Sequence, residues 1–323
     1  MKNKAIIFAL TANVEMAKEI SKELGIPLGK SEVVHFADGE IIVENATTVR
    51  GKNVYIIQST CNPVTERLME LLVFIDGLKR ASAKEICVVM PYYGYARQDR
   101  KAKPREPITS RLVADMLKVA GADRIIVTDL HAPQIQGFFT CPVDDLSAVP
   151  LFADYFRSTL KGKEIVVVSP DHGGVTRARK LASFLNDAPI AIIDKRRPKP
   201  NVAEVMNIIG DVAGKVAVII DDIVDTAGTL TIAAQALKDE GALEVYAAAT
   251  HGILSNPAVS RIENSALVEL VITDSIPLPK EKQIDKIKVL SVANMLAKAI
   301  EYIQKGSSMN VVYDMYKKKD KEQ

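Results

Sequence analysis

Tryptophan is absent from this chain of 323 residues, and cysteine and histidine are rare, with three and four copies. The cysteines, Cys61, Cys87 and Cys141, are scattered and form no CxxC pair. An odd, scattered set is not the pattern of a disulfide framework or of a structural zinc site. We therefore expect free thiols in a reducing compartment.

Net charge and long apolar runs are lacking as well. Lys plus Arg number 42 and Asp plus Glu number 40, so no overall positive field favours nucleic acid or a membrane surface. No run approaches the roughly 18 apolar residues that a membrane-spanning helix needs, and the N-terminal residues lack the pattern of a signal peptide. We predict a cytoplasmic protein with no membrane or nucleic-acid partner, in which any phosphate chemistry depends on local clusters of charge.

Short runs rich in Ile and Val recur along the chain, and they are apolar without alternation. Such runs are typical of strands that are buried on both faces of a parallel sheet. Helical patterns lie between several of them, at residues 65–80, 109–120 and 228–240. This alternation predicts an α/β fold with mostly parallel sheets flanked by helices, in which active sites lie beyond the carboxyl ends of the strands.

The length is enough for about two domains, and the two halves show a weak internal similarity. Residues 88–100 can be aligned with residues 167–179, with a Pro, a Gly and an Arg in common. A duplicated domain would explain this similarity, and so would chance matching of Pro and Gly after strands. We predict a boundary near Ala148, which gives an N-terminal domain at 1–147 and a C-terminal domain at 148–323.

The sharpest motif is VAVIIDDIVDTAGTL, at residues 216–230. An apolar strand ends in Asp221 and Asp222, and small and hydroxyl residues then lead into a helix. The backbone N–H groups of such a turn, together with the helix N-terminus, suit a phosphate monoester. The two carboxylates suit sugar hydroxyls, or Mg²⁺ through water. A capped helix start, with Asp225 or Thr226 as N-cap, is the alternative, and the acidic pair after a buried strand disfavours it. The residues predicted to bind a sugar phosphate are Asp221, Asp222, Asp225, Thr226, Ala227, Gly228 and Thr229.

Three further segments are less specific by themselves. RQDRK, at 97–101, follows a strand and suits phosphate oxygens, although charged loops are commonly solvated surface. Residues 195–199 contain four cations, which would stabilise a transferring phosphoryl group. A solvated basic loop, or a nuclear-import-like patch, has the same composition. FADG, at 36–39, alone would be a turn between strands.

Together these segments resemble the ribose-phosphate pyrophosphokinase family, from about Lys4 to Lys305. The motifs that carry the resemblance are FADGEI (36–41), QSTCNPVTERLMELL (58–72), PYYGYARQDRK (91–101), DLHAPQIQGFF (129–139), SPDHGGVTRAR (169–179), IIDKRRPKPNVAEVMNIIGDV (192–212) and VIIDDIVDTAGTL (218–230). The resemblance implies two tandem phosphoribosyltransferase-like (type I) domains. It also implies transfer of the β,γ-diphosphoryl group of Mg-ATP to the 1-hydroxyl of ribose 5-phosphate, which gives 5-phosphoribosyl 1-diphosphate and AMP for nucleotide biosynthesis.

The resemblance assigns the catalytic cations to Lys195 and Arg197, and Arg197 would also contact ribose 5-phosphate. A mobile loop that carries these cations would stabilise charge on the transferring group while it excludes water. No residue stands out as the base that deprotonates the sugar hydroxyl. Asp221 and Asp222 are candidates by position, although we favour a role in holding the ribose hydroxyls.

The resemblance also implies Mg²⁺ as the cofactor, held by His131 and Asp171, with Asp129 and His172 as supports. A lone His is not by itself a preferred ligand of Mg²⁺, which favours oxygen and keeps several waters, so this assignment comes from the family. The residues that the resemblance places at the ATP site are Phe36, Asp38, Gly39, Glu40, Arg97, Gln98, Asp99 and Arg100.

The chain departs from the family pattern in segments linked to regulation. ATTVRG stands where ESVRG is usual, within a segment that contributes to an inter-subunit effector site in the family. The C-terminal tail lacks the usual Phe. Phosphate activation and ADP inhibition therefore stay open, and the candidate effector residues are Thr48, Arg50, Ser82 and Arg105. The family assembles into homohexamers, and the resemblance implies the same for this chain.

Two other functions are alternatives. A phosphoribosyltransferase would use the loop at 221–229 to pass an activated sugar to a base, but it would need neither an ATP site nor a basic loop. A catalytically silent regulatory homologue would be expected to lose catalytic residues, whereas Lys195, Arg197, His131 and Asp171 are all present.

Overall fold

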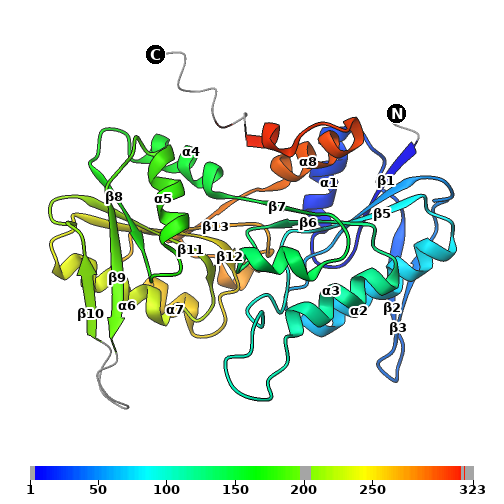
Figure 1. Cartoon of the computed structure of the whole chain (residues 1–323), viewed down its shortest axis with the longest axis horizontal. Coiled ribbons are helices and arrows are strands. Elements are labelled where there is room, and N and C mark those ends of the chain that lie inside the picture. The colour runs from blue at the N-terminus through cyan, green and yellow to red at the C-terminus, as the bar shows by residue number, and fades with distance from the viewer. Residues whose placement is uncertain (1–3, 197–204, 314–315, 317–323) are drawn as a thin grey trace. The chain divides into compact units, whose positions relative to one another are not determined.

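The structure, a computed structural model, describes residues 4–196, 205–313 and 316. Its central strands are Ile- and Val-rich runs found in the sequence, and helices connect most of them (Figure 1). The strands form two mostly parallel sheets whose central members are buried on both faces, so the predicted α/β class is confirmed. Over these described ranges, no helix is long and apolar enough to cross a bilayer.

The chain divides into two compact units, with the first break in the chain after Ser147. Unit 1 takes its described residues from 1–147, 275–277 and 291–315, and unit 2 takes its own from 148–274, 278–290 and 316–323. The sequence prediction assigned everything after 148 to the second domain. The structure instead groups the segment 291–315 with unit 1, because its helix packs on the first helix of that unit.

A parallel sheet of five strands forms the centre of unit 1. Its spatial order is β1 (Ala5–Ala9), β4 (Asn53–Ile57), β5 (Glu85–Met90), β6 (Arg124–Thr128) and β7 (Val143–Leu146). One face packs on α2 (Val64–Arg80) and α3 (Thr109–Ala120) through buried side chains that include Phe8 and Phe74. Burial of these apolar side chains is the main source of stability for the unit.

The remaining elements of unit 1 surround this sheet. α1 (Val14–Leu24) lies against β1 and β4 and packs on α8 (Ala293–Lys305). The antiparallel hairpin of β2 (Ser31–His35) and β3 (Ile41–Asn45) packs on α2 through β3. Two 3₁₀ helices, η2 (Pro133–Phe138) and η4 (Met309–Tyr313), complete the described part of the unit.

Unit 2 contains a sheet of seven strands. Their spatial order is β10 (Val205–Ile209), β9 (Ile190–Arg196), β8 (Ile165–Ser169), β11 (Val216–Val224), β12 (Glu244–Gly252), β13 (Glu269–Thr273) and β14 (Ile287–Leu290). β9 and β10 run side by side and antiparallel (Figure 1), whereas the other neighbours are parallel. The basic segment predicted at 195–199 therefore begins at the end of β9.

Helices cover both faces of this second sheet. On one face α4 (Val149–Thr159) and α5 (Val175–Phe184) pack over Val167, and on the other α6 (Gly228–Asp239) and α7 (Ala258–Glu263) pack over Val166 and Val168. Successive side chains of a strand point to opposite faces, so an unbroken apolar run is what a sheet covered on both sides requires. A 3₁₀ turn, η3 (Lys280–Lys282), lies before β14.

The two units share a topology. In unit 1, the strands apart from the β2–β3 hairpin follow the chain order β1, β4, β5, β6, β7 and are neighbours in that order. In unit 2, the strands apart from β9 and β10 follow the same pattern as β8, β11, β12, β13, β14. β1 therefore corresponds to β8, and β4 to β11. The sequence alignment of 88–100 with 167–179 is wrong, because it equates β5 with β8. Matching Pro and Gly residues follow many strands, so they do not define the register.

Candidate active site

The carboxyl ends of β8 and β11 meet at one edge of the unit 2 sheet. The strands are parallel neighbours, with Ile165 opposite Val216 and Val168 opposite Ile219. A pocket of about 230 Å³ opens at this edge, lined by Pro170, Asp221 and residues 223–230. It includes the whole turn from 225 to 229 that the sequence predicts as a phosphate site.

The turn leads directly into α6, which begins at Gly228. Ala227 precedes it with φ 58° and ψ 4°, in the left-handed region, where a residue with a side chain is strained. Such strain persists only where the surrounding structure holds it. Arg261, on α7, supplies one restraint, because its Nη1 donates to the Thr226 carbonyl at 3.0 Å. Arg261 was not identified from the sequence, since it lies far from the motif and no pattern marks it.

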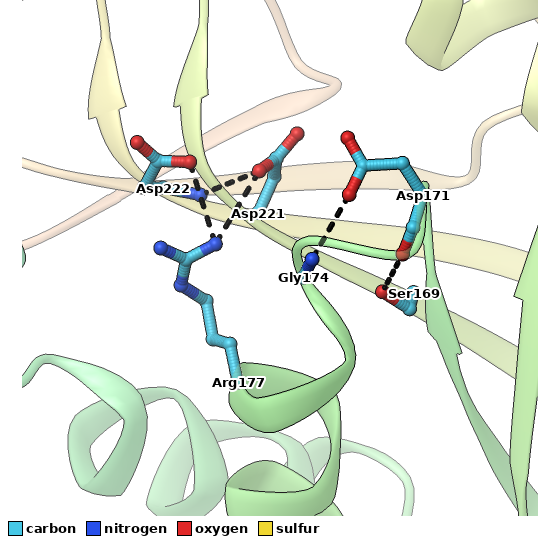
Figure 2. A network of polar contacts seen from close by, with 6 residues as sticks. All are labelled: Ser169, Asp171, Gly174, Arg177, Asp221 and Asp222. Atoms are coloured by element: carbon cyan, nitrogen blue, oxygen red, sulfur yellow. Dashed lines mark hydrogen bonds and ion pairs between the residues drawn. The ribbon is translucent and has the colours of Figure 1, made fainter. Parts of the chain in front are cut away.

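Two carboxylates lie at the end of β11, and a single arginine contacts both of them (Figure 2). Arg177 Nη1 lies 3.4 Å from Asp221 Oδ1 and 3.3 Å from Asp222 Oδ1. The Asp222 side chain is 8 % exposed, whereas Asp221 is 36 % exposed and lines the pocket. The sequence analysis missed Arg177, although it belongs to the quoted SPDHGGVTRAR motif. Its contacts join residues 44 and 45 positions apart in the chain, and no spacing in the sequence marks them.

The environment of Asp221 favours its neutral form. Partial burial, followed by the charge of Asp222, raises the pKa of Asp221 from 3.8 to about 7, and the Arg177 guanidinium acts in the opposite direction. Asp221 Oδ1 also accepts the Asp222 N–H at 2.8 Å. The pocket therefore holds a carboxyl group that changes its charge near neutral pH.

The loop after β8 fixes Asp171 in place. Ser169 Oγ donates to the Asp171 carbonyl at 2.7 Å, and the Gly174 N–H donates to Asp171 Oδ1 at 2.9 Å. A Cβ at position 174 would lie 2.8 Å from Ser169 Oγ, so this close approach requires glycine. The Asp171 side chain is exposed, and Figure 2 shows its second oxygen pointing away from the loop.

The next residue, His172, connects this loop to β9, where His172 Nε2 and Asp194 Oδ1 lie 3.2 Å apart. Lys195 follows on β9, opposite Met206 of β10. The backbone thus places the start of the basic segment on the strand beside β8. Arg197, the second predicted catalytic cation, lies outside the described residues.

In unit 1, the segment at 36–40 forms the tight turn of the β2–β3 hairpin. The Phe36 N–H donates to the Glu40 carbonyl at 2.8 Å, and the Glu40 N–H donates to Asp38 Oδ1 at 3.1 Å. Gly39 has φ 91°, which only glycine adopts readily. The turn leaves Phe36 50 % exposed. An exposed phenyl ring at a hairpin tip is available for stacking.

The predicted nucleotide residues at 97–100 lie in a loop after β5. Gln98 Oε1 accepts from Thr109 Oγ1 at 2.6 Å, and Asp99 Oδ2 accepts from Gln134 Nε2 at 3.0 Å. Arg97 and Arg100 are exposed. The structure thus gives Gln98 and Asp99 partners within unit 1.

Gly94 attaches this loop to the end of β4. Its N–H donates to Thr60 Oγ1 at 2.7 Å. A Cβ at Gly94 would lie 2.3 Å from the Thr60 carbonyl oxygen and 2.9 Å from Thr60 Oγ1. Glycine is therefore required by the close approach of two backbone segments, and Thr60 is a further residue that the sequence analysis did not single out.

The two residues expected to hold magnesium belong to different units. His131 follows β6 in unit 1 and is exposed, and Asp171 follows β8 in unit 2. Asp129, at the end of β6, has φ 41°. Across the part of the chain that the structure describes, three or more His, Cys, Asp or Glu side chains do not gather into a metal-binding group.

Two of the candidate effector residues contact each other in unit 1. Arg50 Nη1 donates to Ser82 Oγ at 3.2 Å, and the Gly51 N–H donates to the Ser82 carbonyl at 2.9 Å. Thr48 and Arg105 are exposed. These contacts bring together a cation and a hydroxyl, which are suitable groups for an anion.

The fold and the site define the chain as an α/β protein of two tandem units with a phosphate-type turn at the carboxyl edge of the second sheet. The family model described as the N-terminal domain of ribose phosphate pyrophosphokinase matches residues 5–121, and the phosphoribosyl synthetase-associated domain matches residues 164–314. The chain belongs to the ribose-phosphate pyrophosphokinase family, and the resemblance found in the sequence is confirmed.

Relatives of known name are similar over nearly their full length. Ribose-phosphate pyrophosphokinase 1 of Listeria innocua is 60 % identical over 311 residues, which cover 96 % of this chain and 98 % of that protein. The ribose-phosphate pyrophosphokinase of Bacillus caldolyticus is 61 % identical over 308 residues, or 95 % and 97 % of the two chains. The crystal structure of phosphoribosylpyrophosphate synthetase from Mycobacterium smegmatis is 42 % identical in sequence and has a TM-score of 0.90. The match covers 94 % of this chain and 100 % of that chain.

We expect Gly94→Ala to weaken nucleotide binding, because the added methyl group forces the 91–100 loop away from Thr60. The KM for Mg-ATP should rise on the order of 10-fold, because the displaced loop is strained by a few kcal/mol at most. Gly137→Ala is the matched control, since nothing lies within 4 Å of a Cβ built there. Steady-state kinetics with both variants test this prediction, and an unchanged KM in Gly94→Ala would contradict it.

Proposed function

We propose that this protein is a ribose-phosphate pyrophosphokinase that acts on ATP and ribose 5-phosphate in the cytoplasm. It transfers the β,γ-diphosphoryl group of ATP to the 1-hydroxyl of ribose 5-phosphate and releases AMP. The product is 5-phosphoribosyl 1-diphosphate. The observation that carries the proposal is the pocket in unit 2, in which a phosphate-type turn and an acidic strand end face the same space.

The pocket suits the two ends of a pentose phosphate. The backbone N–H groups of residues 225–229 and the N-terminus of α6 would hold the 5-phosphate, with the hydroxyls of Thr226 and Thr229 as further donors. Asp221, with Asp222 behind it, would accept hydrogen bonds from the ribose hydroxyls. Binding at both ends leaves the 1-hydroxyl as the part of the sugar that is free to react.

The basic segment at the end of β9 would supply the charge that the reaction needs. As negative charge builds up on the transferring group and on the leaving AMP, Lys195 and Arg197 would stabilise it. The contact between His172 and Asp194 ties the beginning of this segment to the loop that carries Asp171. Alignment of the two substrates accounts for much of the acceleration, because the loose transition state places small demands on a base.

The residues present fit a magnesium ion. Asp171 offers an exposed carboxylate oxygen, while its other oxygen is held by the Gly174 N–H. Such a ligand suits Mg²⁺, which binds proteins through one or two carboxylates and keeps several waters. By the family resemblance, Asp171 and His131 would serve as ligands of the magnesium ions. When bound, magnesium neutralises charge on the phosphate oxygens.

Unit 1 would bind the nucleotide. The exposed ring of Phe36 is suited to stacking on adenine, with Asp38 and Glu40 near its edge. Arg97 and Arg100 are exposed cations whose guanidinium groups match phosphate oxygens. Gln98 and Asp99 would act mainly through the contacts that hold their loop in shape.

We further propose a homohexamer with an anion-responsive effector site. The Arg50–Ser82 contact is the part of that site that unit 1 supplies, together with Thr48 and Arg105. Thr48 keeps the hydroxyl of the family's usual serine, which would suit a bound phosphate. Light scattering with and without phosphate would measure the assembly directly.

Release of AMP from ATP tests the proposed reaction. Purified protein with magnesium and ATP should form AMP only when ribose 5-phosphate is added, and the sugar product should carry the diphosphate. A phosphoribosyltransferase would instead consume 5-phosphoribosyl 1-diphosphate and a base without ATP, and a silent homologue would do neither. Absence of ribose 5-phosphate-dependent AMP would overturn the proposal.

The pH dependence follows from Asp221. Because its pKa in the fold is about 7, the carboxylate that accepts the ribose hydroxyls is lost as pH falls through 7. We expect kcat/KM for ribose 5-phosphate to fall as pH falls over this range. In Asp221→Asn, the part of this fall that comes from protonation of Asp221 should be absent. The phosphate of the substrate titrates equally in both proteins, so the comparison isolates Asp221.

The same shift predicts an effect on the stability of the free protein. A folded pKa above the unfolded value stabilises the fold at low pH, and this contribution is lost as pH rises through about 7. Urea unfolding of wild type and Asp221→Asn at pH 6 and pH 8 would measure it. Identical pH dependence in the two proteins would contradict the assignment.

A further inference from the structure

Arg177 lies outside the residues that the resemblance assigns, yet it contacts the acidic pair of the pocket directly. It is in the first turn of α5, and its side chain is 18 % exposed. Its Nη1 lies 3.4 Å from Asp221 and 3.3 Å from Asp222 (Figure 2). Both distances exceed the usual 2.7–2.9 Å of a charge-assisted hydrogen bond. The guanidinium is therefore shared between the carboxylates, and it does not form a tight fork with either.

The contacts involve one particular oxygen of each carboxylate. Arg177 approaches the Oδ1 atoms, and the Oδ1 of Asp221 also accepts the Asp222 N–H. Figure 2 shows the other oxygen of Asp221 pointing away from Arg177. Asp221 lines the pocket. Its Oδ1 is engaged by Arg177 and the Asp222 N–H, and its second oxygen is available to a ligand.

Arg177 places a positive charge beside two adjacent carboxylates. Like charges at such short range repel one another, and an opposite charge within hydrogen-bonding reach offsets the repulsion. Arg177 comes from the helix that starts at the Asp171 loop, where Gly174 donates to Asp171. One helix start therefore fixes both the Asp171 loop and the orientation of Asp221.

We propose that Arg177 is a positioning residue that, through its shared contact with Asp222, orients the Asp221 carboxylate toward the vicinal hydroxyls of a pentose phosphate, and that it thereby makes the pocket select ribose over 2-deoxyribose. The inference rests on the proposed function, since it takes ribose 5-phosphate as the occupant. Arg177 acts through the carboxylates, so its removal should affect sugars that carry both hydroxyls more than sugars that lack one.

The experiment compares Arg177→Gln with wild type at saturating Mg-ATP. The KM for ribose 5-phosphate and the inhibition constant of 2-deoxyribose 5-phosphate, used as a competitor, are measured for each protein. We expect the KM of Arg177→Gln for ribose 5-phosphate to rise on the order of 10-fold, because a misplaced Asp221 loses a hydrogen bond between a charged group and the sugar. The inhibition constant should change much less, and the KM for ATP should stay the same.

Arg179→Gln is the matched control, because Arg179 is an exposed arginine on the same helix. It removes the same charge without touching the pair and should leave both sugar constants unchanged. Arg177→Lys keeps the charge but offers a point-like donor, so it should recover part of the preference for ribose. Thermal melting of each variant shows whether it is folded. If Arg177→Gln fails to fold, the two sugar constants of Arg177→Lys are compared with those of wild type instead.

Equal weakening of both sugar phosphates in a folded Arg177→Gln or Arg177→Lys variant would overturn the inference, as would an effect as large in Arg179→Gln. Asp221→Asn separates this failure from that of the pocket assignment. If Asp221→Asn leaves the KM for ribose 5-phosphate unchanged, the pocket assignment fails, and the inference fails with it. If Asp221→Asn raises that KM and the Arg177 variants do not, the inference alone fails.

Discussion

Hydrogen bonding between the parallel strands β8 and β11 is the constraint on which the site depends. Because both strands run in the same direction in register, the loop that carries Asp171 and the strand end that carries Asp221 are delivered to the same edge of the sheet. The apolar interior of both strands holds that register. Polar groups beyond the strand ends can then form a site without disturbing the core.

The same topology in unit 1 ends in different chemistry. β1 and β4 correspond to β8 and β11, but a buried network follows them. Thr11 Oγ1 donates to Glu70 Oε1 at 2.8 Å, and Gln58 Nε2 donates to Glu70 Oε2 at 2.8 Å. Glu70 is 1 % exposed. In unit 1 the carboxylate is used to hold the two strand ends together, whereas in unit 2 Asp221 faces a pocket.

Much of this fold could be predicted from the sequence, because unbroken apolar runs reveal strands that are buried on both sides. The turn at 225–229 was also predictable, since small residues after an acidic strand end are a local pattern. Arg177 and Arg261 were not, because each reaches its partner across the fold and no spacing marks the contact. The grouping of α8 with unit 1 and the correspondence of β1 with β8 likewise depend on long-range packing. Matching of Pro and Gly in the sequence pointed to the wrong strand.

The proposed function depends above all on the turn at 225–229, which would hold the phosphate of ribose 5-phosphate. Amide hydrogen exchange tests it most directly, in the presence of magnesium and a non-reacting ATP analogue, with the analogue alone as the reference. We expect ribose 5-phosphate to slow exchange at the amides of residues 225–229. Slower exchange elsewhere, with no change at these amides, would contradict it.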